Sequence, residues 1–256
     1  MGEFAPLADA DLERRFGGLK RLHGEAAYLR LRGLRLAVVG LGGVGSWAAE
    51  ALARSGVAAL SLVDLDHVAE SNINRQVQAL GTTLGMAKAT ALQQRIADIH
   101  PGCAVTAVEE FASPDNWPAL LPEPVDGVID ACDQAKAKMA IAAWGLASGV
   151  PVVCVGAAGG KHRAQAVEVD DLARVTHDPL LARLRQGLRQ RWGAPRQGTI
   201  GLTCVFSRES VQPPADGECS VDGSLNCHGY GSSVMVTATF GMVAAAEIVR
   251  LTLGKR

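Results

Sequence analysis

Residues 64–76 carry side chains suited to chemistry on phosphate groups. Carboxylate, amide and guanidinium groups lie close together in this segment, at Asp64, Asp66, Asn72, Arg75 and Gln76. A guanidinium group stabilises charge on a phosphoryl group, whereas hydride transfer has no use for such a cluster. The segment therefore favours chemistry on the phosphates of a nucleotide over redox chemistry.

The residues before this segment predict the turn that would hold those phosphates. Residues 34–40 form a short apolar run, typical of a buried parallel strand, and residues 46–55 have the composition of a helix. Between them, glycines in GxGxxG spacing allow a tight turn and a close approach of the backbone to phosphate at the helix N-terminus. The expected nucleotide-binding glycines are Gly40, Gly42, Gly43 and Gly45.

A second predicted strand, residues 59–64, ends at Asp64. A carboxylate in this position can accept hydrogen bonds from the hydroxyl groups of a ribose. Strand, turn, helix, strand and acid thus come in the order of a nucleotide-binding unit. This order does not distinguish among NAD, FAD, S-adenosylmethionine and ATP.

Two charged residues further along the chain extend the candidate site. Lys88 could neutralise a polyphosphate together with Arg75, and Asp133 could hold Mg²⁺ that bridges phosphates. Each also has a simpler explanation, since a lysine is often solvated and Asp133 could cap a helix that begins at Gln134. Their places after successive predicted strands favour the catalytic interpretation, because the carboxyl ends of parallel strands meet at one edge of a sheet.

Composition limits the class of protein. The chain has 256 residues, of which 48% are hydrophobic, and its formal net charge is −1, so any contact with RNA must be a local patch. No two of the six cysteines form a CxxC pair, which indicates no zinc site and no thioredoxin-like site. No signal peptide is recognised, so a cytoplasmic protein is expected. The cysteines are Cys103, Cys132, Cys154, Cys204, Cys219 and Cys227.

Helices and strands are expected to alternate in most of the chain, which predicts an α/β fold with a doubly wound, mostly parallel sheet. We divide the chain into an N-terminal helical segment (1–33), a nucleotide-binding core (34–160) and an extension with mixed or antiparallel strands (161–256). In the core, helices are expected at 85–100 and 134–149, and strands at 104–108, 125–130 and 151–155. In the extension, short strands are expected at 167–169 and 204–206, and a mobile loop at 211–226.

The most apolar stretch, residues 234–251, is nearly long enough to span a membrane. Glu247 and Arg250 interrupt it. We therefore expect a helix in the core or in a dimer interface, and no membrane partner.

The motifs GxGGVGS, DxDxVxxSNxNRQ, GxxKA and DAxD resemble those of the ubiquitin-activating-enzyme-like adenylating superfamily. The resemblance implies that the protein binds ATP and Mg²⁺, activates a carboxylate and forms a homodimer. It places Gly42 and Gly45 at the phosphates, Asp64 at the ribose and Mg²⁺ on Asp133. It also places Asn72, Arg75 and Lys88 at the triphosphate, and implies that Arg15 reaches the ATP of the partner subunit.

Four further segments, 16–25, 176–189, 201–209 and 229–241, resemble the tRNA threonylcarbamoyladenosine dehydratases. That family uses ATP to dehydrate N6-threonylcarbamoyladenosine, next to the anticodon of tRNA, into a cyclic form. The resemblance leaves open whether a monovalent cation is also bound. Three other functions stay open: an adenylyltransferase for a ubiquitin-like sulfur carrier, a sulfur-relay partner of a cysteine desulfurase, and an NAD(P)-dependent oxidoreductase.

Cys227 and the arginine-rich segment 183–196 can each be interpreted in two ways. Cys227 beside His228 could be a reactive thiolate or a small residue in a close-packed turn. The arginines of segment 183–196 could contact tRNA phosphates or form the solvated face of a helix. They are Arg183, Arg185, Arg189, Arg191 and Arg196. Cys132, Cys154 and Cys204 are expected in the core.

Overall fold

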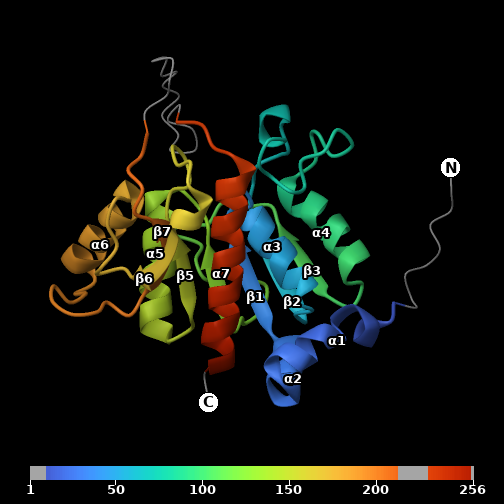
Figure 1. Ribbon diagram of the computed structural model, residues 1–256. Helices are drawn as coiled ribbons and strands as arrows, with labels where there is room; N and C mark the ends of the chain where they lie inside the picture. Colours follow the sequence, from blue (N-terminus) through green and yellow to red (C-terminus); the bar gives the residue numbers. More distant parts are fainter. Residues whose placement is uncertain (1–9, 213–229, 255–256) are drawn as a thin grey trace.

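The computed structural model describes residues 10–212 and 230–254. Its centre is a seven-stranded sheet with the order β3-β2-β1-β4-β5-β7-β6 (Figure 1). All neighbouring strands are parallel except β6 and β7. The strands are β1 (Arg35–Val39), β2 (Ala59–Val63), β3 (Ala104–Val108), β4 (Gly127–Asp130), β5 (Val152–Val155), β6 (Val167–Asp171) and β7 (Thr203–Ser207).

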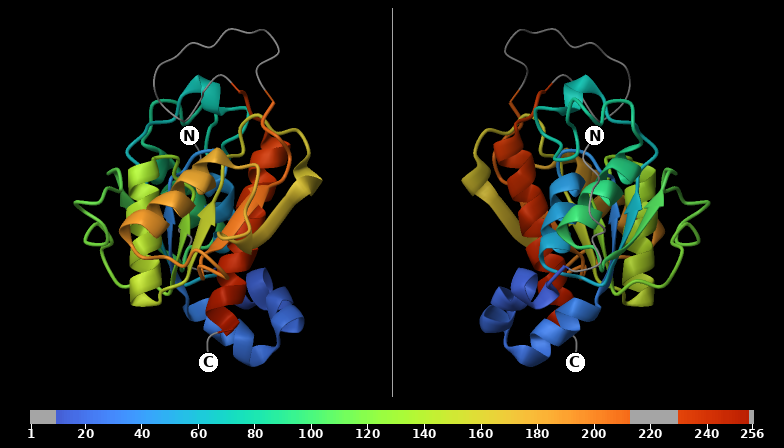
Figure 2. Two further views of the ribbon diagram at one scale, coloured as in Figure 1. Left: turned by 90° about the vertical axis from the view of Figure 1, so that its left-hand side faces the viewer. Right: turned by 90° about the vertical axis from the view of Figure 1, so that its right-hand side faces the viewer.

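Helices cover both faces of the sheet, as the predicted doubly wound fold requires (Figure 2). α3, α4 and α7 share one apolar core with one face, and α5 and α6 share a second core with the other face. The helices are α1 (Leu12–His23), α2 (Glu25–Gly33), α3 (Gly45–Arg54), α4 (Lys88–Ile99), α5 (Ala135–Ser148), α6 (Pro179–Arg191) and α7 (Val234–Gly254), with short 3₁₀ turns η2 (Glu70–Asn72) and η3 (Ala164–Ala166).

The strands alternate between these two cores. In β1, Leu36 and Val38 belong to the core under α3 and α7, whereas Ala37 and Val39 belong to the core under α5 and α6. A strand that is buried on both faces has a continuous apolar sequence, because the side chains on each face pack against helices. This is why residues 34–40 could be assigned to a central strand from sequence.

The parallel register brings the ends of three strands together. Val39 pairs with Val63 of β2 and with Asp130 of β4, so the segments that follow these strands start at the same edge of the sheet. At the same edge, Val155 of β5 pairs with Val205 of β7. The candidate site residues of the sequence follow β1, β2 and β4, and the register places them side by side.

α7 has the length and composition of a membrane-spanning helix, but only by those two criteria. It packs against α3, β4 and β5 in the core of the molecule. Gly241 lets it approach α3 closely, because a Cβ atom there would lie 2.4 Å from the Val44 carbonyl oxygen. The expected core helix is therefore present, and it ends at Gly254.

Candidate nucleotide-binding site

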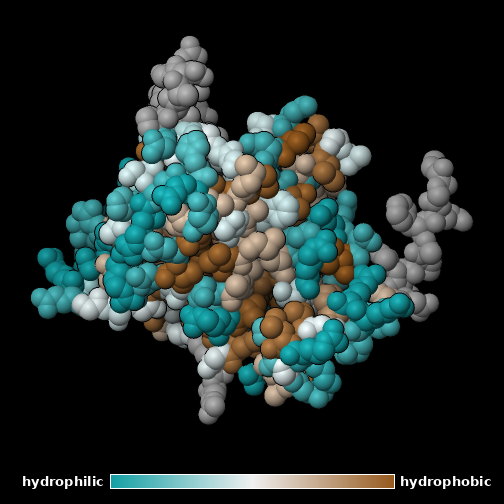
Figure 3. All heavy atoms as spheres, viewed as in Figure 1, coloured by the Kyte–Doolittle hydropathy of each residue, from teal (hydrophilic) through white to brown (hydrophobic). Residues whose placement is uncertain are grey.

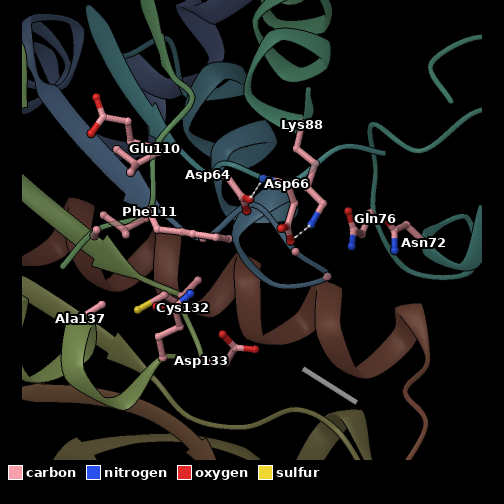
Figure 4. Close-up of a pocket in the computed structure, with 18 of the residues that line it drawn as sticks. Asp64, Asp66, Asn72, Gln76, Lys88, Glu110, Phe111, Cys132, Asp133 and Ala137 are labelled. Atoms are coloured by element: carbon pink, nitrogen blue, oxygen red, sulfur yellow. Dashed lines mark hydrogen bonds and ion pairs between the residues drawn. The ribbon is translucent and has the colours of Figure 1, made fainter. Parts of the chain in front are cut away.

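A cavity of about 730 Å³ opens at the carboxyl ends of β1, β2 and β4. Its walls are the glycine turn, the segments 71–76 and 110–112, the start of α4, the loop 131–134 and the first turn of α5. Lys88, Asp66 and Asp64 enter it from one side, and Cys132 and Asp133 from the other (Figure 4). The volume is in the range of pockets that hold a nucleotide-sized ligand.

The four expected glycines have two different roles. Gly40, Gly42 and Gly43 line the cavity, whereas Gly45 does not. A Cβ atom on Gly45 would lie 1.8 Å from the Gly40 carbonyl oxygen, so this glycine permits α3 to pack on the turn. Gly40 has φ +85°, a conformation that side chains disfavour, and a Cβ atom there would lie 2.8 Å from the backbone nitrogen of Cys132.

Asp64 fixes the glycine turn as well as facing the cavity. Its Oδ2 accepts a hydrogen bond of 2.6 Å from the Leu41 N–H, and its Oδ1 accepts one of 2.9 Å from the Asp66 N–H. Burial raises the pKa of Asp64 above its ordinary value, although the charge of Lys88 acts in the opposite direction. Each carboxylate oxygen keeps a further lone pair, so the group can still accept a hydrogen bond from a ribose hydroxyl.

Lys88 is the first residue of α4 and is 5% exposed. Its Nζ lies 2.7 Å from Oδ2 of Asp66, and its backbone N–H donates to the Asp66 carbonyl oxygen. The buried ammonium group is thereby held at the wall of the cavity instead of extending into solvent. The simpler explanation of Lys88 as a solvated side chain is wrong.

Segment 70–78 is held in place by its own polar groups. Oδ1 of Asn72 accepts from the Ala69 N–H, which leaves the Asn72 amide group at the cavity. Arg75 donates to the Ser71 carbonyl oxygen and to Oδ1 of Asn74. The indole of Trp47, on α3, donates to the Arg75 carbonyl oxygen at 2.9 Å. The expected residues Asn72 and Arg75 line the cavity on a segment anchored to a helix.

Gln76 is 5% exposed and also lines the cavity. Its Oε1 accepts from Nε2 of Gln78, which in turn donates to the Leu41 carbonyl oxygen at 2.9 Å. Gln78 is a residue that sequence analysis missed. No local pattern signalled it, because Gln78 reaches Gln76 through a turn that the Ala79 N–H closes on the Gln76 carbonyl oxygen.

Asp133 lies in the loop between β4 and α5 and lines the cavity. It does not cap the helix, because the N-cap residue is Gln134 and no side chain bonds the first turn. Its Oδ2 is buried and has no hydrogen-bond partner among the described residues. Burial raises the pKa of Asp133 above its ordinary value of 3.8. A buried carboxylate oxygen without a partner suits a cation, so the donor set fits Mg²⁺.

No group of three or more potential metal ligands lies among the described residues. Asp133 alone therefore cannot complete an octahedral shell. Mg²⁺ usually keeps several waters and binds through one or two carboxylates and the phosphates of its substrate, which is the arrangement that one carboxylate beside an open cavity permits.

Under this loop lies a buried ion pair that sequence analysis also missed. Nζ of Lys138 lies 2.9 Å from Oδ2 of Asp130, and both side chains are 0% exposed. Oδ1 of Asp130 accepts hydrogen bonds from the N–H and the thiol of Cys132. The signal was available, since Lys138 shares a buried helix face with Ile141 and Ala142. The pair ties the loop that carries Asp133 to α5.

Two of the three cysteines expected in the core are there, whereas Cys132 lines the cavity. Cys154 and Cys204 are buried, and Cys132 is half-buried beside Asp130. Burial raises the pKa of all three thiols well above the ordinary value, so they are poor nucleophiles.

Other expected residues lie away from the cavity. Arg15 donates to the Asp98 and Ile99 carbonyl oxygens at the C-terminal end of α4, the opposite end from Lys88. Arg15 thus does not contribute to the cavity of its own chain. Cys227 and Cys219, and most of the loop expected at 211–226, lie outside the described residues.

The arginine segment divides into two groups. Arg185 donates to the Leu172 and Val175 carbonyl oxygens, and Arg189 to those of Pro195 and Arg196, so both hold the fold of the extension. Arg183, Arg191 and Arg196 are exposed and face outward. Within this segment, only the second group makes no hydrogen bond or ion pair through its guanidinium to the described residues, and this exposure suits a polyanion.

These features define an α/β nucleotide-binding protein with acidic and basic groups around the place of the phosphates. The chain belongs to the ThiF family, which it matches over residues 13–256. It is 41% identical over 253 residues to the tRNA threonylcarbamoyladenosine dehydratase of Escherichia coli, with 94% of each chain covered. It is 37% identical over 248 residues to the Haemophilus influenzae protein of the same name, with 95% of each covered.

The structure is similar to the crystal structure of the E. coli tRNA N6-threonylcarbamoyladenosine dehydratase in complex with ATP. The TM-score is 0.87 at 40% identity, and the match covers 96% of this chain and 97% of that chain. The family resemblance inferred from the motifs and the predicted α/β fold are confirmed.

Proposed function

We propose that this protein uses ATP to dehydrate N6-threonylcarbamoyladenosine in tRNA to its cyclic form. The observation that carries the proposal is the match along nearly the whole chain to dehydratases of this name, one of them crystallised with ATP. The match includes the extension after residue 160, where segments 176–189 and 201–209 lie.

The reaction activates a threonyl carboxylate, which is a poor electrophile because oxide is a poor leaving group. Transfer of AMP or phosphate from ATP to one carboxylate oxygen gives that oxygen a good leaving group. The neighbouring carbamoyl group then attacks the carbonyl carbon, and AMP or phosphate departs with the oxygen, so that the nucleoside loses one water overall. The attack is intramolecular, which lowers its barrier, and no protein nucleophile is required.

The side chains around the cavity have distinct tasks in this proposal. Arg75 and Lys88 stabilise negative charge on the transferred phosphoryl group. Asp133 holds Mg²⁺, which neutralises the phosphates when it is bound. Asn72 and Gln76 contribute amide groups from the segment that Trp47 anchors.

A homodimer is part of the proposal. Apolar surface runs down the middle of Figure 3, where Figure 1 places α7. Met235 and Met242 of this helix are 65% and 42% exposed, whereas Phe240 and Ile248 on its other side are buried in the core. A second copy that covers this face would bury them. We further propose that Arg15 reaches the ATP of the partner subunit, since it has no role in the cavity of its own chain.

The tRNA contact is assigned to Arg183, Arg191 and Arg196, because their guanidinium groups are exposed on the extension. Since the net charge of the chain is −1, such a local patch must supply the attraction to phosphates. A tRNA-modifying enzyme of this kind works in the cytoplasm.

The direct test is incubation with ATP, Mg²⁺ and tRNA that carries threonylcarbamoyladenosine. Mass spectrometry should show loss of one water from the modified nucleoside, only when ATP is present. If the nucleoside is unchanged and pyrophosphate exchange instead requires a small protein that ends in Gly-Gly, the protein is an adenylyltransferase for a sulfur carrier. Loss of all activity in Cys227→Ser with ATP turnover intact would indicate a sulfur relay with a cysteine desulfurase.

A further inference from the structure

Lys161 lies six residues after the end of β5 and is 3% exposed. Its ammonium group does not join any ion pair within 4.0 Å among the described residues. Instead it donates to three main-chain carbonyl oxygens: Glu209 at 2.8 Å, Ser207 at 3.1 Å and His177 at 3.4 Å. Lys88 and Lys138, the other two buried lysines discussed above, both pair with carboxylates. Lys161 therefore sits in a different kind of environment.

The three carbonyl groups come from separate segments that are held rigidly. Ser207 is the last residue of β7, and Glu209 follows two residues later. His177 lies just before α6. His177 has φ +59°, a left-handed conformation that is uncommon for a residue other than glycine. The carboxylate of Glu209 accepts hydrogen bonds from the N–H groups of His162 and Arg163, next to Lys161 itself. The carbonyl oxygens are thus fixed in place by other bonds.

Main-chain carbonyl oxygens are the ligands that bind monovalent cations in proteins, because their dipoles replace the hydration shell of the ion. An ammonium group carries the same charge and has three N–H donors, so three carbonyl oxygens satisfy it completely. Burial lowers the pKa of Lys161, while the charges of Asp178 and Glu209 oppose this shift. Carbonyl oxygens that converge in a buried place without a cation would repel one another.

We propose that the carbonyl groups of His177, Ser207 and Glu209 form a monovalent-cation site and that Lys161 fills it with its own ammonium group. The protein therefore needs no K⁺ or Na⁺ at this place. Removal of the side chain opens the site to a free ion. The ammonium group joins the loop after β5 to the segments before α6 and after β7, at the same edge of the sheet as the nucleotide cavity.

The test is thermal unfolding of the full chain in KCl, NaCl or choline chloride at equal ionic strength. The wild-type Tm in each salt is the reference, and the Tm of each variant is compared with it in the same salt. Lys161→Ala should lower the Tm in choline chloride by about 5–10 °C, because charged hydrogen bonds are lost. KCl or NaCl should restore at least half of that loss, since the space left by the side chain admits an ion.

Two variants serve as controls. Lys161→Met fills the space without a charge, so its Tm should fall as far and no salt should restore it. Lys136→Ala removes an exposed lysine and should change nothing.

The proposal is wrong if the Tm of Lys161→Ala equals that of Lys136→Ala. It is also wrong if K⁺ and Na⁺ reduce the Tm loss of Lys161→Ala relative to the wild type no more than choline does, or if they reduce the loss of Lys161→Met equally. If Lys161→Ala does not fold in any of the three salts, Lys161→Gln is used instead. The glutamine amide keeps a neutral hydrogen-bond donor at this place. The Tm of this variant should then depend on K⁺ or Na⁺, and a Tm independent of the salt would refute the proposal. None of these measurements depends on the reaction that the enzyme catalyses.

Discussion

The carboxyl edge of the sheet is used in two opposite ways. After β1, β2 and β4, the chain leaves a cavity and surrounds it with Asp64, Lys88 and Asp133. After β5 and β7, the chain closes the space with the ammonium group of Lys161. The same edge of the sheet can therefore form a ligand-binding cavity or a closed structural contact. The outcome depends on whether a side chain of the protein occupies the space.

The two regions are connected. Nδ2 of Asn74 donates to the Ser232 carbonyl oxygen at 3.0 Å, just before α7. Next to Lys161, the Gly160 N–H donates to the Gly231 carbonyl oxygen, and the Gly160 carbonyl oxygen accepts from the Gln212 N–H. The filled region can thus set the position of segments that border the cavity. The following predictions separate residues that act on the ligand from residues that hold the edge together.

The largest effect is expected for Lys138→Met, which leaves the Asp130 carboxylate buried without its partner. The free energy of unfolding should fall by about 3–5 kcal/mol. Denaturant unfolding measures this change. The double variant Lys138→Met with Asp130→Leu should recover much of the stability, and a single variant as stable as the wild type would contradict the structural role.

Asp133→Asn should lower the rate of dehydration by about 100-fold, because the amide cannot neutralise Mg²⁺. Its stability should stay the same or rise, since the unpartnered carboxylate oxygen of Asp133 is costly to bury. Single-turnover kinetics and thermal unfolding, measured on the same preparation, check both parts. A fall in rate that is accompanied by a fall in Tm would assign Asp133 to the fold instead of the ligand.

Substitution of Arg183, Arg191 and Arg196 by glutamine should weaken tRNA binding by about 10-fold and flatten its salt dependence. ATP binding should not change, because these residues lie outside the cavity. Binding of tRNA over a range of KCl concentrations gives both quantities.

The matched control for this variant removes three exposed charges elsewhere, in Arg14→Gln, Arg21→Gln and Lys136→Gln. It should leave the affinity for tRNA nearly unchanged. Equal losses in both triple variants would mean that overall charge, and not the extension, attracts the tRNA.

The smallest effect concerns pH. Because burial raises the pKa of Asp133 above 3.8, this group takes up a proton at a higher pH than an ordinary carboxyl group. The acidic limb of kcat/KM should therefore lie above pH 3.8 and move to lower pH as Mg²⁺ concentration rises, since the cation competes with the proton. A limb that is independent of Mg²⁺ would point to another group, such as Asp64, whose pKa is raised too.

Local patterns predicted most elements to within a few residues. The strand at 104–108 matches β3, because its alternating pattern and the Pro101 turn before it are local signals. The helix expected from residue 85 begins only at Lys88. Residues 85–88 bond back to segment 66–68 through the Gly85, Lys88 and Val68 N–H groups, and this pairing across the loop delays the helix.

Most residues of the candidate site were also predicted from the sequence. Asp64, Asn72, Arg75, Lys88 and Asp133 line the cavity as expected. Asp64 directly follows β2 and Lys88 begins α4, whereas Asn72 and Arg75 lie in the loop between them and were predicted from the residue types of that segment. Gln78, Lys138 and Phe111, which also lines the cavity, were missed. Arg185 and Arg189 looked like Arg183 in sequence, but their carbonyl partners lie in other segments.

The sequence by itself determined the order of strands and helices, the glycine turn and the chemical type of the site. These depend on residue spacing and backbone conformation within short segments. Only the tertiary structure decided which charged groups serve a ligand and which serve the fold. Lys138 pairs with Asp130, which is only eight residues away, but both side chains are buried only once the sheet and α5 have packed together. Lys161 bonds carbonyl groups up to 48 residues further along the chain. The cost of an unpaired charge at either lysine depends on this burial, which the sequence alone does not specify.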